Sequence, residues 1–119
     1  KRGAKKYGHV TPVQREASKL DKEFWLSIKK SDVWVMAPEG SGDNRSHVAP
    51  FPYELPRRLI KAFSYVGERV LDPFVGSGTT LRAAADLQRN GLGYEINPEI
   101  ATRTLEHLTA KFSEQPETK

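Results

Sequence analysis

The sequence has no cysteine among its 119 residues, and this absence excludes disulfide bonds, thiolate metal ligands and thiol nucleophiles together. Its three histidines, His9, His47 and His107, are too scattered to indicate a metal site. No apolar run approaches the roughly 20 residues that span a bilayer, and no signal-peptide pattern stands at the start. We therefore expect a cytoplasmic chain that does not engage a membrane.

Acidic side chains are scarce in the first 30 residues, which contain three of them against nine Lys or Arg. Residues 31–119 contain twelve acids against ten Lys or Arg, so the net charge of +4 comes from the amino-terminal segment. Residues 1–12 also have few apolar side chains, and we predict a flexible basic arm there and a folded domain over residues 13–119. Such an arm either binds a nucleic-acid backbone, with release of counterions, or is a solvated tail, and the sequence leaves both readings open.

Apolar spacing predicts the secondary structure. We expect helices over about residues 13–28, 55–63 and 79–89 and from Pro98 onward, and short strands over residues 32–36, 69–71 and 92–96. Asn90-Gly91 is expected to end the third helix, and Asn97 to cap the last one. The last helix should bury a face made of Ala101, Leu105, Leu108 and Phe112. Two consecutive strand-loop-helix units favour a parallel sheet with right-handed crossovers, so the fold class is α/β.

Two carboxylates flank a glycine loop at the ends of the central predicted strands. Asp72 ends the first strand and precedes Gly76-Ser77-Gly78, and Glu95 comes 23 residues later, near the end of the next strand. In an open α/β sheet, ligands bind beyond the carboxyl ends of the strands, glycines admit them to the main chain, and a later acid binds ribose hydroxyls. The sequence therefore predicts a site for a nucleoside-containing cofactor.

The residues after the loop separate three cofactor classes. A phosphate-binding P-loop needs Lys after its last glycine, but Thr79-Thr80 follows Gly78. A dinucleotide fingerprint needs a third glycine where Leu81 stands. What remains is a ligand with a ribose and a charged amino-acid part, and S-adenosyl-L-methionine has both.

The motifs resemble those of one enzyme family. Asp72-Pro73-Phe74-Val75-Gly76-Ser77-Gly78-Thr79-Thr80 resembles the cofactor motif of the DNA methyltransferases that modify the exocyclic amine of adenine (N-6) or cytosine (N-4). The segments 49–56 and 93–99 resemble, in turn, the wall around the methionine end of the cofactor and the ribose-binding strand. The resemblance runs from about Asp32 to Leu108. It implies a partial Rossmann-like S-adenosylmethionine-dependent methyltransferase fold, DNA as a partner and a restriction-modification type of system.

The loop chemistry and the resemblance together predict the cofactor contacts. The predicted contact residues are Pro50, Phe51, Asp72, Phe74, Gly76, Ser77, Gly78, Thr79, Glu95 and Asn97. Purely structural roles remain open for several of these residues. Asp72 would then cap the turn after its strand, Phe74 would pack in the core, and Glu95 would pair with a nearby arginine such as Arg69 or Arg89.

The order of the motifs resembles the permuted, beta-class arrangement, in which the catalytic motif comes first. That motif is an Asp, Asn or Ser followed by two prolines and an aromatic residue, and it does not occur in these 119 residues. We therefore predict no catalytic residue here and an inactive isolated chain. We expect completion by a chain that carries the catalytic motif, by a missing amino-terminal half, or by a second copy that closes the sheet edge. A non-catalytic or regulatory cofactor-binding module, and a methyltransferase acting on RNA or a small molecule, stay as alternatives.

Overall fold

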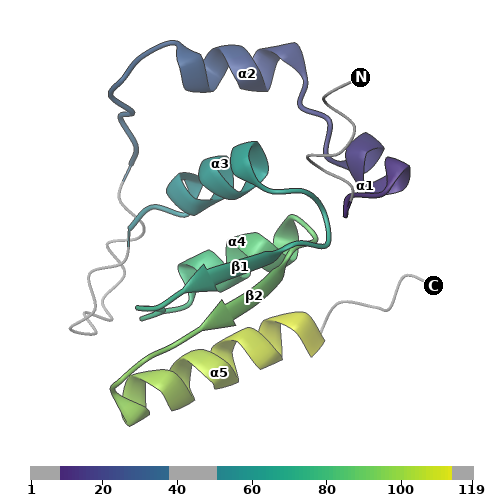
Figure 1. Cartoon of the computed structure of the whole chain (residues 1–119). Helices are drawn as coiled ribbons and strands as arrows, with labels where there is room; N and C mark the ends of the chain where they lie inside the picture. The colour runs from purple at the N-terminus through teal and green to yellow at the C-terminus, as the bar shows by residue number, and fades with distance from the viewer. Residues whose placement is uncertain (1–8, 38–50, 114–119) are drawn as a thin grey trace.

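The computed structural model describes residues 9–37 and 51–113, which form five helices and two strands. Figure 1 shows α2 and α3 stacked above a strand pair backed by α4, with α5 below. The elements in chain order are α1 (Pro12–Ala17), α2 (Lys22–Lys29), α3 (Glu54–Phe63), β1 (Arg69–Asp72), α4 (Thr79–Asp86), β2 (Asn90–Gly93) and α5 (Pro98–Ser113). In the described ranges, no helix is long and apolar enough to cross a membrane.

The two strands pair in parallel, which confirms that prediction for the central unit. Val70 lies opposite Gly91, and Leu71 lies opposite Leu92. On one face of the pair, α4 packs with Ala83 and Ala84 fully buried. A Cβ added at Gly91 would lie 2.8 Å from the Leu81 side chain, so the glycine allows α4 to approach the strand closely. Ile60 of α3 completes this small core.

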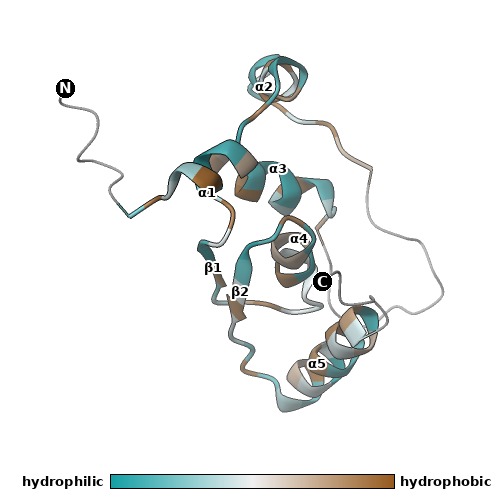
Figure 2. Ribbon diagram, turned by 90° about the vertical axis from the view of Figure 1, so that its right-hand side faces the viewer, coloured by the Kyte–Doolittle hydropathy of each residue, from teal (hydrophilic) through white to brown (hydrophobic). Residues whose placement is uncertain are grey.

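The other face of the strand pair has no cover among the described elements. Leu92 alternates with Gly91, which faces α4, and must therefore point to the opposite side together with its partner Leu71. Leu71 is 59% exposed and Leu92 is 50% exposed. Figure 2, which looks at the molecule from a second side, shows α3 and α4 on the same side of β1 and β2.

The amino-terminal region differs from the single helix predicted over residues 13–28. α1 ends at Ala17, and α2 begins after Asp21, whose Oδ1 accepts a hydrogen bond from the Phe24 amide at 2.6 Å. Ser18 interrupts the pattern because its hydroxyl accepts a hydrogen bond from the distant Val66 amide at 2.8 Å. Short polar side chains of this kind favour helix ends over helix interiors. The periodicity was continuous, but the helix is broken by a cap and a long-range contact.

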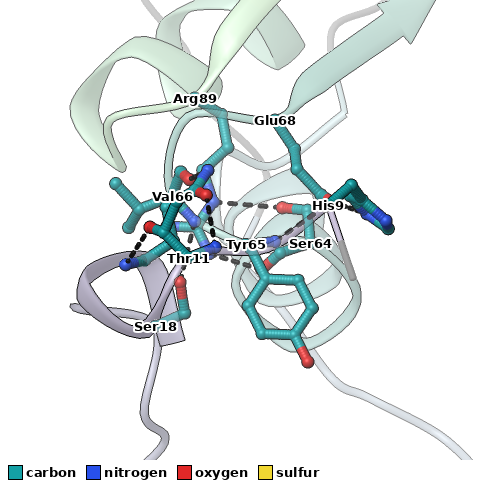
Figure 3. Close-up of polar contacts among 9 residues, drawn as sticks. His9, Thr11, Ser18, Ser64, Tyr65, Val66, Glu68 and Arg89 are labelled. Carbon is teal, nitrogen blue, oxygen red and sulfur yellow. Dashed lines mark hydrogen bonds and ion pairs between the residues drawn. The ribbon is translucent and has the colours of Figure 1, made fainter. Parts of the chain in front are cut away.

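A polar cluster fixes α1 to the turn before β1 (Figure 3). Besides the Ser18 contact, Gln14 Nε2 donates to the Val66 carbonyl at 2.9 Å, and His9 Nε2 lies 3.4 Å from Glu68 Oε1. Residues 1–8 of the predicted basic arm lie outside the described residues, whereas Val10 is buried and Thr11 caps α1 with its side chain. The folded part of the chain thus includes residues 9–12.

Three further expectations need correction. The residues from Asp32 to Met36 form no strand with any described residue, although Trp34 Nε1 donates to the Ile28 carbonyl at 3.3 Å. α4 ends at Asp86, three residues early, and Gln88 makes the turn with a positive φ of 61°. Asn90-Gly91 therefore belongs to β2, which ends at Gly93, because the Asn90 amide already donates to the Glu68 carbonyl at 2.9 Å. Strand pairing outweighed the turn tendency of that dipeptide.

The last helix begins as predicted, and the face that it packs differs from the predicted one at a single position. Asn97 Oδ1 accepts hydrogen bonds from the amides of Glu99 and Ile100 at 2.9 and 3.2 Å, and Pro98 is the first helical residue. Leu105, expected to be buried, is 67% exposed, and Thr104 is the residue that α5 buries. Ala101, Leu108 and Phe112 of the predicted face are partly buried, so the error concerns Leu105, in whose place Thr104 packs.

Candidate functional site

The carboxyl ends of β1 and β2 bring the predicted carboxylates to one edge of the strand pair. Asp72 is the last residue of β1, and Glu95 lies two residues beyond β2. The two segments stay paired past the strands, because the Tyr94 amide donates to the Asp72 carbonyl at 3.0 Å and the Val75 amide donates to the Tyr94 carbonyl at 2.9 Å. The glycine loop thus begins directly beside the segment that bears Glu95.

Glu95 joins the two halves of the site. Its Oε2 accepts a hydrogen bond from the Gly76 amide at 3.1 Å, and its Oε1 accepts one from the Asn97 amide at 3.0 Å. Each carboxylate oxygen can accept a further hydrogen bond, so this anchoring leaves capacity for ligand hydroxyls. The carboxylate is thereby held in place before any ligand binds.

The alternative that Glu95 pairs with Arg89 is not what the structure has. Arg89 donates from Nε to Ser64 Oγ at 3.0 Å and from its terminal nitrogens to the carbonyls of Ser64 and Leu87 at 2.6 and 2.7 Å. Its residue is only 7% exposed, and burial lowers the pKa of its guanidinium. Arg89 therefore fastens α3 to the end of α4, away from Glu95.

Asp72 and Phe74 form the first turn of the loop. Asp72 Oδ1 accepts a hydrogen bond from the Phe74 amide at 2.9 Å, which is the capping role that the sequence left open. That bond does not use the second oxygen of Asp72, and a carboxylate accepts several donors at once. The Phe74 side chain is 85% exposed, so it is not a core residue among the described ones.

The backbone conformation of the loop requires glycine at positions 76 and 78. Gly76 has a φ of 50° and Gly78 a φ of 84°, in the left-handed region that other residues rarely adopt. Gly78 is the N-cap of α4, and its amide donates to the Val75 carbonyl at 2.8 Å. Ser77 Oγ lies 3.2 Å from Oγ1 of the buried Thr79. The loop is a tight turn at the strand ends, and the backbone amides and carbonyls of Gly76 and Gly78 are hydrogen-bonded within the protein.

The remaining predicted residues lie around this loop or outside the described ranges. Asn97 uses its side-chain oxygen to cap α5 and its amide to bind Glu95. Phe51 is 41% exposed, ahead of α3. Pro50 lies outside the described residues. A groove of about 290 Å³ also adjoins the loop on its α5 side, lined among others by Arg82, Arg103 and His107, but neither Asp72 nor Glu95 lines it.

Sequence reasoning missed Thr104, whose Oγ1 donates to the Gly76 carbonyl at 2.5 Å. A signal was available, since Ala101, Thr104 and Leu108 follow the three- and four-residue spacing of one helix face. Among the described residues, no group of three His, Asp or Glu side chains is placed to bind a metal ion.

Comparison with known proteins defines the family. The family model for N6 and N4 methyltransferases, described as DNA methylase, matches residues 3–106. That match covers most of the chain, so the protein belongs to this DNA methylase family. The match confirms the resemblance to DNA methyltransferases that modify N-6 of adenine or N-4 of cytosine, whereas the permuted order of the motifs stays a prediction.

Individual relatives agree with that assignment. The chain is 42% identical over 89 residues to the type II methyltransferase M.MjaI of Methanocaldococcus jannaschii, which covers 70% of this chain and 27% of the relative. It is 35% identical over 109 residues to M.SmaI of Serratia marcescens, covering 90% of this chain and 35% of the relative. The chain thus spans only about a quarter to a third of the length of such relatives.

Solved structures confirm the fold class. A putative DNA modification methylase from Thermus thermophilus superposes with a TM-score of 0.71 at 40% identity, over 89% of this chain and 40% of that one. The structure of the same Thermus methylase in complex with S-adenosyl-L-methionine gives a TM-score of 0.68 at 39% identity, over 89% of this chain and 39% of that one. The α/β arrangement with a parallel strand pair is therefore part of the S-adenosylmethionine-dependent methyltransferase fold.

Proposed function

We propose that this chain supplies the S-adenosylmethionine-binding part of a DNA amino-methyltransferase of a restriction-modification system, acting on N-6 of adenine or N-4 of cytosine. The observation that supports it most is the Glu95 carboxylate, fixed by two backbone amides beside the positive-φ glycine loop. A carboxylate held there can accept both hydroxyls of a ribose, and the glycine loop beside it would lie next to the rest of the ligand.

The other predicted residues divide the cofactor between them. We assign Asp72 and the Gly76–Gly78 loop to the methionine end, where the carboxylate would attract the ammonium group. Phe74, with its exposed ring, and Phe51, with Pro50 beside it in the sequence, would wall the cofactor. Thr79 and Asn97 would act mainly by fixing the loop and the start of α5, since their polar groups are bonded within the site.

Bound S-adenosylmethionine would supply an electrophilic methyl group for direct attack by the exocyclic amine of a flipped base. The residues of this chain would hold the donor. They would not hold the base, because the motif with two prolines and an aromatic residue does not occur in the 119 residues. Base-orienting groups would come from a catalytic chain, an amino-terminal half or, less directly, a second copy. As a DNA-modifying enzyme it would work in the cytoplasm.

The bare face of the strand pair supports such completion. Parallel sheets are ordinarily covered on both faces, and Leu71 and Leu92 have no cover among the described residues. The share of the relatives that this chain covers, 24–27% for three of them, leaves ample sequence for the missing layer and strands. We infer that the completing part packs on this face.

Isothermal titration calorimetry with S-adenosylmethionine tests the cofactor assignment. Glu95→Ala and Asp72→Ala should each weaken binding by roughly ten- to a hundredfold, because a charge-assisted hydrogen bond is worth about 1.5–3 kcal/mol. Glu99→Ala is the matched control, since that carboxylate lies on the exposed first turn of α5. Equal affinity in all three variants, with folding confirmed by circular dichroism, would reject the assignment.

The basic arm is tested separately with DNA. Removing residues 1–8 deletes Lys1, Arg2, Lys5 and Lys6 and leaves the packed residues 9–12 in place. The slope of log affinity against log salt should become shallower, because fewer counterions are released on binding. If the slope of the completed protein does not change, the arm does not contact phosphates.

A further inference from the structure

One peptide of the glycine loop is held from both sides. The Gly76 amide donates to Glu95 Oε2 at 3.1 Å, and the Gly76 carbonyl accepts from Thr104 Oγ1 at 2.5 Å. Thr104 comes from the middle of α5, 28 residues further along the chain, and is 7% exposed. A buried hydroxyl aimed at a single loop carbonyl is well shielded from competing water.

The methyl group of the same side chain supports the other end of the loop. A Cβ built on Gly78 would lie 2.8 Å from Thr104 Cγ2 and 3.1 Å from Leu108 Cδ1. The α carbon of Gly78 therefore rests against α5 with no room for a side chain. Thr104 thus touches both glycines, through its hydroxyl at Gly76 and its methyl at Gly78.

Gly76 and Gly78 carry no side chains of their own that could anchor them, and glycine backbone loses the most conformational freedom when it is ordered. An anchor from α5 removes that freedom before a ligand arrives. The loop amides then keep the orientation in which Gly76 N–H meets Glu95. Without the anchor, part of the ligand's binding free energy would go into ordering the loop.

We propose that Thr104 is a positioning residue of the cofactor site, which sets cofactor affinity by fixing the backbone of Gly76–Gly78 from α5. The proposal rests on the cofactor site described above as the proposed function. Thr104 lies 28 residues after Gly76 in the sequence, so the sequence by itself does not indicate that α5 contributes to the site.

Three threonine variants separate the hydroxyl from the rest of the side chain. Thr104→Val keeps the shape and removes the hydroxyl, so S-adenosylmethionine binding should weaken about tenfold in calorimetry of the 119-residue chain. Thr104→Ser keeps the hydroxyl and should restore affinity to within about threefold of the parent. Thr109→Val, on an exposed turn of the same helix, is the matched control and should bind like the parent.

Hydrogen exchange of the amides in residues 74–80 without ligand supplies the second measurement. Exchange should be faster in Thr104→Val than in Thr109→Val and near the parent rate in Thr104→Ser. If Thr104→Val does not fold, Thr104→Ala replaces it and is compared with Thr104→Ser by the same two measurements.

The outcomes distinguish this proposal from the proposed function. Loop exchange and affinity that are the same with and without the hydroxyl overturn the positioning role. A second outcome is that the loop amides exchange faster in Thr104→Val than in the parent, but the parent binds no S-adenosylmethionine even when completed. That outcome would overturn the proposed function and leave the loop anchor in place. Faster exchange with unchanged affinity would overturn the link from α5 to cofactor binding.

Discussion

The two faces of the same strand pair differ sharply. On the α4 side, Ala83 and Ala84 have no exposed surface, and Gly91 is pressed against Leu81. On the other side, Leu71 and Leu92 are half exposed or more. Alternate residues of the same two strands form the two faces, so the difference in burial does not come from one strand being badly formed. It indicates that, among the described residues, only one of the two layers that ordinarily cover a parallel sheet is present.

The candidate site lies at the carboxyl ends of β1 and β2, next to both the covered and the bare face. The loop from β1 to α4 is anchored by Glu95 and Thr104 without help from the bare face. Under the proposed function, binding of the methyl donor would therefore be separable from binding of the base. The following predictions test that separation, from the largest expected effect to the smallest.

Methyl transfer should depend entirely on completion of the bare face. The isolated chain should transfer no tritiated methyl groups to mixed-sequence duplex DNA, because holding the acceptor in line contributes up to roughly 7–11 kcal/mol and this chain has no motif for it. Adding a chain with an Asp-Pro-Pro-Tyr-like motif should restore transfer, and mutating that motif should abolish it again. Robust transfer by the purified chain alone would contradict the division of labour, with Asn97 the first residue to examine.

A larger side chain on the covered face should destabilise the protein. Ala83→Leu should lower the free energy of unfolding by about 1–3 kcal/mol or more, because extra methylenes have no space at a fully buried position. Ala85→Leu, on the exposed side of the same helix, should change it by less than about 0.5 kcal/mol. Urea denaturation followed by circular dichroism measures both. Similar losses in the two variants would show that α4 is not packed as described.

A tyrosine on the covered side makes the packing pH-dependent. The Tyr53 hydroxyl donates to Asp86 Oδ2 at 2.7 Å, and burial, with this hydrogen bond, raises the pKa of Tyr53 from 10.0 to about 12. Because the folded-state pKa is raised, the stabilisation is complete below pH 10 and is lost as the pH rises toward about 12. Tyr53→Phe should cost about 0.5–1.5 kcal/mol at pH 7.

The same variant gives a control for the titration. The difference in unfolding free energy between the parent and Tyr53→Phe should shrink as denaturation is repeated from about pH 9 toward about pH 12. Tyrosinate absorbance should lose its highest-pH phase in Tyr53→Phe and keep it in Tyr94→Phe, whose side chain is 60% exposed. A difference that stays constant over this range would mean that the hydrogen bond to Asp86 does not form.

The bare face should tolerate polar substitution in the chain by itself. Leu92→Ser should change the free energy of unfolding by less than about 1 kcal/mol, because half of that side chain is already exposed. In the completed enzyme the same substitution should weaken assembly by a larger amount, which sedimentation or titration with the completing chain would measure. A large loss in the isolated chain would show that this face is already packed.

Local signals in the sequence predicted the turn and the helix start around the strand ends. Asp72, the positive-φ glycines and the Asn97 cap follow from short-range chemistry of strand ends, tight turns and helix starts, and β1, α4 and α5 begin close to where the pattern placed them. The motifs were also sufficient to identify the methylase family, since each is a short run of neighbouring residues. These features are determined by interactions within a few residues of one another.

Long-range contacts decided the rest. The break between α1 and α2 depends on Ser18 reaching Val66, and the early start of β2 depends on Asn90 pairing with Glu68. The burial of Thr104 in place of Leu105 depends on α5 docking against the glycine loop. The spacing of apolar residues predicts which side of a helix or strand is buried. It does not predict which distant residue each side chain contacts. The sequence alone therefore determined the chemistry at the strand ends, and only the tertiary structure decided which distant side chains hold it in place.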